Sequence, residues 1–364
     1  MNYSTEEKIC ILLGQTGVVA SKFYALWQQF SGTKDFLDNF ENSTFAQQLL
    51  GDHFKKVCLG LKNGEADRII SQMERWNIFA TTCFSETFPE TLANIPDPPY
   101  ILFYRGNVKL LSSQCISVVG TRKVSAYGVK VATTFTEKLA EHFTVVSGLA
   151  YGVDSIAHET TLKQHGKTIA VLGGGLVDVY PAANRGLADR IVQNGGLVVT
   201  EYGYNAVPRA YNFPHRNRLV AGLSLGLLVC QSPQKSGTAS TVECALDQGR
   251  DVFVVPGEIF DSGFSGNNML IKSMQGVCVT SPKDILDFYH LEDAKPQSIK
   301  VVQLNFDEQK VVDALSEGQL TFDKLVEKTN ISPADLNFLL ANLEIKSIIA
   351  RLPGNSYRLY GGLE

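Results

Sequence analysis

The sequence lacks the cysteine and histidine spacings that build metal sites and disulfide frameworks. Its seven cysteines are scattered, odd in number and without a CxxC pair, and its six histidines form no HExxH spacing. Scattered cysteines of this kind are typical of a reducing compartment. We therefore expect a cytoplasmic protein with mostly buried thiols and no metal site.

Long hydrophobic runs are also missing. A membrane-spanning helix needs about 18 or more apolar residues in succession, and no run in this chain approaches that length. The first ten residues, MNYSTEEKIC, lack the basic n-region of a secretory signal. We expect neither a membrane span nor a signal peptide.

No part of the chain carries an excess of positive charge. The formal net charge is −4, divided as −1 over residues 1–80, −1 over 81–299 and −2 over 300–364. A general cationic surface for nucleic acid is therefore excluded. If the protein binds nucleic acid, it does so through a local pocket that focuses the positive charge.

Two nucleotide-binding fingerprints are absent. No GxGxxG motif opens the first strand-to-helix unit, and no GxxxxGK[ST] motif occurs anywhere. The first absence disfavours a dinucleotide coenzyme, and the second disfavours ATP hydrolysis by a P-loop. We expect no cofactor.

What is present is an ordinary globular composition, with 44% hydrophobic and 19% charged residues, enough for a large core. A length of 364 residues predicts two or three domains.

Helical patterns cover residues 1–80, which resemble a helix-hairpin-helix or SAM-like module. The alternative for this module is a helical bundle used only for packing or protein contacts. Residues 81–111 are rich in proline and aromatic residues, and we expect an extended connector there.

Apolar strands alternate with helical patterns over residues 112–290. This alternation predicts a parallel sheet covered by helices on both faces, in an α/β fold. In such sheets, ligands bind at the carboxyl ends of the strands. The expected strands are CISVVG, FTVVSG, KTIAVLGGG, GLVVTEY, LGLLVCQ, RDVFVVPG and VCVTSP.

A linker is expected over residues 291–304, followed by a further domain over 305–364. The pattern of this domain is three helices and a two-stranded hairpin, which resembles a winged helix. Its third helix, ADLNFLLANLEIK, offers a single lysine and two acids. Because phosphate binding depends on cations, we favour a protein-contact or autoregulatory role for this domain over DNA binding.

The segment from Arg209 to Leu223, RAYNFPHRNRLVAGL, concentrates cations and aromatic rings immediately before a predicted helix. Arginines bind phosphates, flat rings stack on bases, and a helix N-terminus supplies free N–H groups. The alternative is a solvated basic loop before a core helix. The strand-end loops favour an anion or nucleotide site over a solvated loop. Five of them carry glycine, and one carries Arg122, which can clamp a phosphate.

Candidate nucleophiles and bases are present, but they form no ordered triad. They are Ser147, Asp154, His158, His215, Ser236, Thr238 and Glu243. Asp154 and His158 are four residues apart and share one helix face. We favour a structural hydrogen-bonding pair over a catalytic dyad.

Six ordered segments of the chain resemble the successive signatures of the bacterial DNA-processing protein A (Smf) family. They are VVGTRKVSAYG, VVSGLAYGVDSIAH, IAVLGGGLVDVYP, NFPHRNRLVAGLS, SGTASTVECALDQGRDVFVVPG and SGNNMLI. The resemblance covers about residues 85–290 in detail, and the terminal modules match more loosely. It implies an extended Rossmann-like domain that binds single-stranded DNA, usually as a dimer. It also implies a non-enzymatic protein that protects incoming single strands during natural transformation and helps to load a RecA-type recombinase.

The resemblance further implies which residues contact DNA. The basic and aromatic members would hold phosphates and stack a base, and the glycines and Thr238 would line the rim with backbone donors. Position 121 is less secure, because serine is more usual there than threonine. The expected DNA-binding residues are Gly120, Thr121, Arg122, Gly148, Arg209, Phe213, Arg216, Asn217, Arg218, Gly237 and Thr238.

Two alternatives belong to other classes of protein. SGTASTVE loosely resembles the GGxGT…E loop of phosphoribohydrolases that act on nucleoside monophosphates, an interpretation in which Glu243 would be catalytic. That loop here lacks its second glycine. A winged-helix transcription factor is the other alternative, and the acidic third helix disfavours it.

Overall fold

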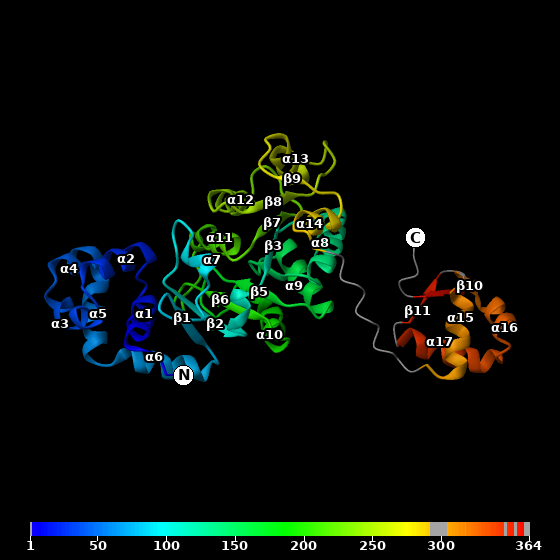
Figure 1. Ribbon diagram of the computed structural model, residues 1–364, viewed down its shortest axis with the longest axis horizontal. Coiled ribbons are helices and arrows are strands. Elements are labelled where there is room, and N and C mark those ends of the chain that lie inside the picture. Colours follow the sequence, from blue (N-terminus) through cyan, green and yellow to red (C-terminus); the bar gives the residue numbers. More distant parts are fainter. Residues whose placement is uncertain (1, 292–303, 317, 346–347, 353–354, 360–364) are drawn as a thin grey trace. The chain divides into compact units, whose positions relative to one another are not determined.

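The computed structural model describes residues 2–291, 304–316, 318–345, 348–352 and 355–359, which divide into two compact units, 1–294 and 295–364 (Figure 1). The linker predicted over 291–304 lies outside the described residues except at its two ends. The helical module and the sheet predicted as separate domains share the first unit.

Six α-helices form the described part of the N-terminal module. A capping box between Ser4 and Glu7 starts the first of them, and Gly17, with φ of +84°, ends it in the left-handed conformation. The helices are α1 (Thr5–Thr16), α2 (Ala20–Gln29), α3 (Thr33–Asn39), α4 (Thr44–Leu50), α5 (Asp52–Lys62) and α6 (Glu65–Arg75). Gly51, with φ of +55°, separates α4 from α5 within the stretch TFAQQLLGDHFKKVCLGL.

A nine-stranded sheet is the centre of the first unit, with strand order β1-β2-β6-β5-β4-β3-β7-β8-β9. The strands from β3 to β9 are parallel, whereas β1 and β2 add antiparallel at one edge. The predicted parallel sheet is confirmed. The strands are β1 (Phe79–Thr82), β2 (Ile101–Gly106), β3 (Cys115–Val119), β4 (Thr144–Ser147), β5 (Thr168–Val171), β6 (Leu197–Thr200), β7 (Gly226–Val229), β8 (Asp251–Val254) and β9 (Val277–Cys278).

Helices cover both faces of this sheet and bury its apolar strands. One face packs on α8 (Ala126–Leu139), α9 (Val153–Lys163) and α14 (Pro282–Phe288), and the other packs on α11 (Asn212–Gly222) and α12 (Gly237–Asp247). Helices α10 (Arg185–Gln193) and α13 (Ser265–Lys272) also belong to this unit.

The segment 81–111 is part of the sheet and not a connector beside it. Its strand β2 pairs with β1 and β6, and its side chains alternate between two cores. Ile101 and Phe103 pack with the N-terminal helices, while Leu102 and Tyr104 pack against the opposite face. The prolines still leave room for a four-residue helix, α7 (Glu90–Ala93), and a short 3₁₀ helix at Val108–Ser112.

The second unit has the three helices and the hairpin that the sequence predicts. A short strand, β10, adds to the two expected strands, in the order β10-β12-β11. The elements are α15 (Phe306–Leu315), β10 (Leu320–Thr321), α16 (Phe322–Thr329), α17 (Pro333–Ile345), β11 (Ile349–Leu352) and β12 (Ser356–Leu359). Among the described residues of either unit, no helix combines the length and apolarity needed to cross a membrane.

Because β2 is a core strand, truncating its central side chain should be costly. Phe103 is fully buried, whereas Phe260 is 93% exposed. We expect Phe103→Ala to lower the free energy of unfolding by about 3–5 kcal/mol, the usual cost of a buried Phe-to-Ala cavity. The matched control Phe260→Ala should change it by less than about 0.5 kcal/mol, as for exposed sites. Equal denaturant midpoints for the two variants would contradict this role of β2.

Candidate functional site

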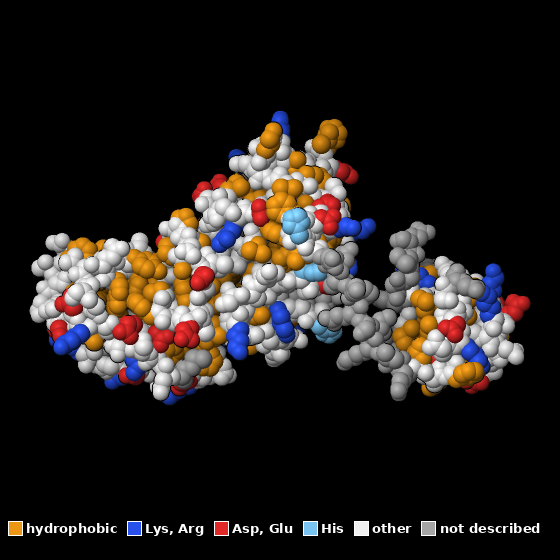
Figure 2. All heavy atoms as spheres, viewed as in Figure 1, with side chains coloured by type: hydrophobic (Ala, Val, Ile, Leu, Met, Phe, Trp, Pro, Cys, Tyr) orange, Lys and Arg blue, Asp and Glu red, His pale blue; other side chains and the backbone are white. Residues whose placement is uncertain are grey.

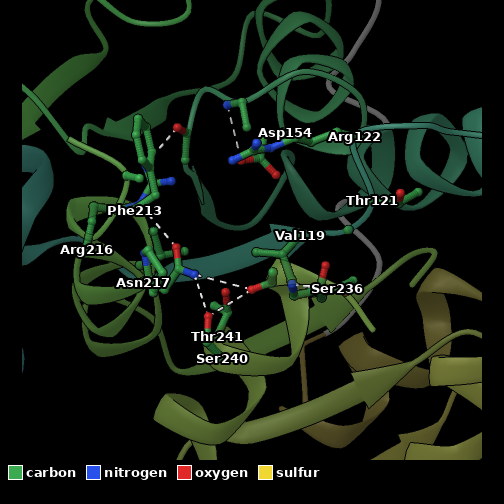
Figure 3. A pocket seen from close by; sticks show the side chains of 18 of the residues that line it. Val119, Thr121, Arg122, Asp154, Phe213, Arg216, Asn217, Ser236, Ser240 and Thr241 are labelled. Atoms are coloured by element: carbon green, nitrogen blue, oxygen red, sulfur yellow. Dashed lines mark hydrogen bonds between the residues drawn. The ribbon is translucent and has the colours of Figure 1, made fainter. Parts of the chain in front are cut away.

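A pocket of about 690 Å³ opens where the strand order reverses (Figure 3). Strand β3 lies between β4 and β7, so the loops that follow these strands diverge at their carboxyl ends and leave a crevice. We call this cavity the strand-end pocket. Its lining includes Gly120, Thr121, Arg122, Gly148, Asp154, Tyr180, Phe213, Arg216, Asn217, Lys235, Gly237 and Thr238.

Arg216 forms a buried side of the pocket and ties two strand ends together. Its Nη1 donates to the carbonyl oxygen of Gly148 at 2.7 Å and to that of Val171, just after β4 and at the end of β5. A Cβ atom at Gly148 would lie 2.5 Å from Nη2, so only glycine admits the guanidinium here. Arg216 is 4% exposed. It therefore acts mainly as a fixed, buried positive charge in the lining of the pocket.

Asp154 is the acidic counterpart of this buried arginine. It lines the pocket and accepts a hydrogen bond from the backbone N–H of Ala150 at 3.3 Å. Burial raises the pKa of Asp154, and Arg216 opposes that rise. Burial lowers the pKa of Arg216, and Asp154 opposes that fall. The two groups partly offset each other's desolvation, which keeps a cation tolerable at this depth.

Arg122 is an exposed cation of the pocket. The loop that carries it is fixed, because the Thr121 N–H donates to the Gln231 carbonyl at 2.7 Å. Gly120 lets this loop pack closely, since a Cβ there would lie 2.6 Å from Val153. Arg122 forms no ion pair with any residue in the described part of the chain. Its guanidinium is therefore free to bind an anion.

The start of α12 lies at another side of the pocket. Ser236 accepts the Thr238 N–H at 3.1 Å with its hydroxyl and the Ala239 N–H at 3.2 Å with its carbonyl, so the Gly237 N–H is the donor of this turn that faces open space. Asn217 joins α11 to this helix start, because its Nδ2 donates to the Ser240 hydroxyl at 2.9 Å. Both helices begin at the pocket, so the positive ends of both dipoles lie there.

Phe213 and Tyr180 form an aromatic wall. Their ring centroids are 5.5 Å apart with an interplanar angle of 57°. The Phe213 ring lies over Gly173, where a Cβ would be 3.0 Å from Cδ1. The ring is only partly buried, so one side of this wall is accessible to a planar ligand.

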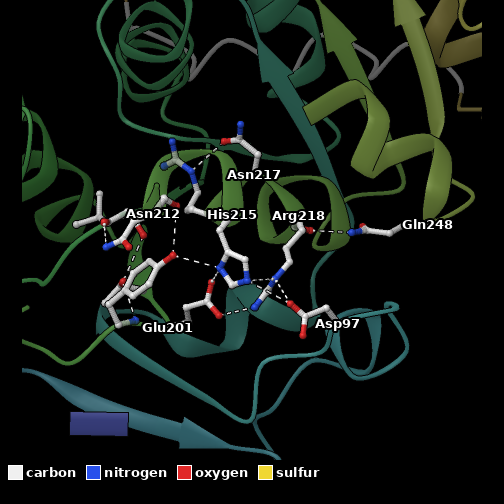
Figure 4. Close-up of polar contacts among 12 residues, drawn as sticks. Asp97, Glu201, Asn212, His215, Asn217, Arg218 and Gln248 are labelled. Atoms are coloured by element: carbon white, nitrogen blue, oxygen red, sulfur yellow. Dashed lines mark hydrogen bonds and ion pairs between the residues drawn. The ribbon is translucent and has the colours of Figure 1, made fainter. Parts of the chain in front are cut away.

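Two of the predicted arginines lie outside the strand-end pocket. Arg209 lines a neighbouring groove and donates from Nη1 to the Tyr211 hydroxyl at 2.9 Å. Arg218 points into a cluster of charged residues, where it pairs with Glu201 and, at 3.0 Å, with Asp97 (Figure 4). The other nine predicted residues line the pocket together.

His215 completes this cluster. Its Nε2 lies 3.2 Å from Asp97 Oδ2, and its Nδ1 lies 3.3 Å from Glu201 Oε1. The hydrogen bonds to Asp97 and Glu201 raise the pKa of His215 to about 9. The cluster connects segment 81–111 and the end of β6 to helix α11. It thereby fixes the orientation in which α11 begins at the pocket.

Sequence reasoning overlooked Lys235 and Tyr180, which also line the pocket. Lys235 directly precedes the Ser-Gly-Thr turn, so a basic residue beside a strand-end glycine loop was an available signal. Tyr180 follows the triple glycine by a few residues, but nothing in the sequence indicates that its ring meets Phe213.

Three of the candidate nucleophiles and bases are bonded elsewhere or lie outside the strand-end pocket. The Ser147 hydroxyl donates to the Val118 carbonyl at 2.7 Å. The pairing expected between Asp154 and His158 is wrong, because the His158 Nδ1 lies 2.7 Å from the Thr168 hydroxyl and its Nε2 has no hydrogen-bond partner in the described chain. Burial lowers the pKa of His158 to about 3. Glu243 is exposed on α12 and is absent from the pocket lining.

Comparisons with known protein families match most of the chain. A model of the family described as DNA recombination-mediator protein A matches residues 79–290, and a model of the DprA winged helix domain matches residues 296–355. The chain is 37% identical over 334 residues to protein Smf of Escherichia coli, covering 84% of this chain and 88% of that protein. It is 42% identical over 201 residues to DNA processing protein DprA of Streptococcus pneumoniae, covering 55% and 71%.

Two solved structures resemble the fold. The structure of DNA processing protein A from Streptococcus pneumoniae matches with a TM-score of 0.65 and 31% identity, covering 79% of this chain and 98% of that one. The structure of DNA processing protein A from Helicobacter pylori matches with a TM-score of 0.54 and 29% identity, covering 58% and 95%. The Helicobacter pylori structure concerns the single-stranded DNA binding mode of that protein.

The charged cluster makes a contribution to stability that depends on pH. A pKa raised from 6.5 to about 9 means that protonated His215 stabilises the fold fully below about pH 6.5. This contribution declines as pH rises through about 9. We expect wild type to exceed His215→Gln in free energy of unfolding at pH 6, with the difference shrinking by pH 9.5.

Denaturant unfolding across this pH range measures the difference. His290→Asn is the control, because His290 is exposed and lies outside the cluster. A His215→Gln difference that stayed constant or grew with pH would show that the histidine does not carry charge in the cluster.

Proposed function

The chain belongs to the DNA recombination-mediator protein A family, and from that premise we propose that it binds single-stranded DNA in the strand-end pocket. The observation that carries this proposal is the combination of Arg122, the α12 N-terminus and the Phe213 ring around one cavity. Cations and N–H groups suit phosphates, and an accessible ring suits an unpaired base.

The charge distribution supports a focused site. The face in Figure 2 has Lys and Arg side chains interspersed with Asp and Glu, without a continuous basic band. Within the pocket, by contrast, Arg122 and Lys235 are exposed, and Arg216 lies beneath them. Two to three phosphate contacts predict a salt dependence with a log–log slope of about −1.4 to −2.

The shape of the pocket favours single strands over duplex DNA. The Phe213 and Tyr180 rings line the cavity, so a base must leave its stack and its partner to reach them. That cost is smallest for a strand that is already unpaired. Asn217 is the side-chain amide in the pocket lining, and its Nδ2 already donates to the Ser240 hydroxyl. Stacking without edge recognition predicts binding that tolerates any sequence.

We further propose that the protein acts in the cytoplasm as a homodimer, without enzymatic activity. Two pockets that hold one strand gain affinity through effective concentration, which offsets the small size of each pocket. The edge strand β9 supports self-association, since both of its residues are exposed and Met274 beside it is 92% exposed. In this role the dimer protects incoming strands and assists a RecA-type recombinase during natural transformation or recombination.

The winged helix fits a protein-contact role better than a DNA-contact role. Its third helix, α17, has an acid in its first turn and no basic residue in its last turn. Phe338 on this helix is 69% exposed, which suits an apolar contact. Deleting residues 295–364 should therefore leave affinity for single strands within about twofold, because no phosphate contact is lost.

Fluorescence anisotropy with labelled oligo-dT tests the pocket. We expect Arg122→Ala to weaken binding and to reduce the magnitude of the salt slope by about 0.7, the loss of one phosphate contact. Phe213→Ala should weaken binding by about fivefold to 100-fold, equivalent to one lost stacking contact.

Lys123→Ala is the matched control, because Lys123 is exposed and adjacent but does not line the pocket. Circular dichroism would verify that each variant is folded. Wild-type affinity in both pocket variants would refute the site, and loss of binding on deletion of 295–364 would assign it to the winged helix.

A further inference from the structure

A second cavity, of about 520 Å³, lies between the N-terminal helices and the segment 201–215. Its walls are the turn between α1 and α2, part of α5, residues 99–101 and one side of segment 201–215. We call it the hairpin groove. Residues that define it are Gly17, Val19, His53, Lys56, Arg209 and Tyr211.

The hairpin groove and the strand-end pocket share a wall. Pro208, Ala210 and Phe213 line the strand-end pocket, while Arg209 and Tyr211 line the hairpin groove. Over residues 207–211, alternate residues therefore line opposite cavities, and Phe213 follows on α11. A strand that leaves Phe213 has only this segment to cross before it reaches Tyr211.

The hairpin groove is positively charged. Lys56 is exposed and forms no ion pair in the described chain, and Arg209 has only the Tyr211 hydroxyl as a side-chain partner there. Glu201 is the one acid among the described lining residues, and it is already paired with Arg218 and His215. The free charges in the groove are therefore cationic.

Hydrogen-bond donors accompany these cations. No side chain caps the start of α2, and Val19 and Ala20 at that start line the groove. Free N–H groups at a helix start, together with a lysine and an arginine, suit phosphate oxygens.

Tyr211 adds a stacking surface between the two cavities. Its side chain is 66% exposed, and Arg209 lies 6.0 Å from the centre of its ring. An exposed ring flanked by a guanidinium is typical of surfaces on which unpaired bases stack.

The two walls of the groove are fixed to each other. Gln15 donates from Nε2 to Asn205 Oδ1 at 2.6 Å and accepts the N–H of Tyr204 at 3.1 Å. The Tyr204 hydroxyl donates to Gln72 on α6 at 2.7 Å. These bonds hold α1 and α6 against segment 201–215. The groove therefore needs no rearrangement to accept a ligand.

We propose that the hairpin groove binds the phosphate backbone of the same DNA single strand as it leaves the strand-end pocket. This inference rests on the proposed function of that pocket. The strand crosses segment 206–213 at Tyr211, and its next phosphates bind Arg209, Lys56 and the start of α2. The N-terminal module is thus part of the DNA path and not only a packing domain.

Binding of two oligonucleotides by the full chain tests the proposal. An oligo-dT of about 5 nucleotides fits one pocket, and one of about 15 nucleotides extends beyond it, within the range of single-strand site sizes. We expect Lys56→Ala to leave the short oligonucleotide unaffected. It should weaken the long one and reduce the magnitude of its salt slope by about 0.7. Tyr211→Ser should weaken the long oligonucleotide by about fivefold or more.

Lys55→Ala is the matched control, since Lys55 neighbours Lys56 on α5, is exposed and does not line the groove. Wild-type affinity of Lys56→Ala and Tyr211→Ser for the long oligonucleotide, with Arg122→Ala impaired, would overturn the groove alone. Equal weakening by Lys55→Ala and Lys56→Ala would also overturn it, because general charge would then explain the effect. Failure of the wild-type chain to bind either oligonucleotide would refute the proposed function itself.

Discussion

The candidate site depends on the hydrogen bonds that the buried guanidinium of Arg216 makes to two strand ends. The guanidinium donates to carbonyl oxygens at the ends of two parallel strands. It also fills the space that a side chain at position 148 would need, so this position requires glycine. A buried cation is costly unless its N–H groups are bonded and an opposite charge lies near, and here the carbonyls and Asp154 meet both conditions. The strand ends, α11 and the strand-end pocket are thereby fixed in one arrangement.

The segment around Arg209 to Arg218 distributes its cations over three environments. Arg216 supports the strand-end pocket, Arg209 faces the hairpin groove, and Arg218 holds the charged cluster that fixes α11. A stretch of similar charges along the sequence thus performs separate tasks, because an extended segment and then a helix turn successive side chains in different directions. Only part of its charge is free for an anion.

The parallel sheet could be predicted from the sequence because apolar strands and helical patterns alternate without ambiguity. The meeting of strand-end loops at one edge follows from that topology, so Gly120, Arg122 and Gly237 could be placed together. The direction of the Arg218 side chain could not be predicted, since one of its acidic partners, Asp97, belongs to a segment far away in the sequence. Likewise, β2 could not be predicted, because the prolines that precede it in segment 81–111 are typical of an extended connector and the sequence does not reveal its pairing with β6.

A crystal structure of the full chain with a short oligo-dT is the most direct test of the central claim. The account predicts a phosphate beside Arg122 and the first N–H groups of α12, with a base against Phe213. A strand bound on the winged helix or another surface, with the strand-end pocket free of DNA, would contradict it.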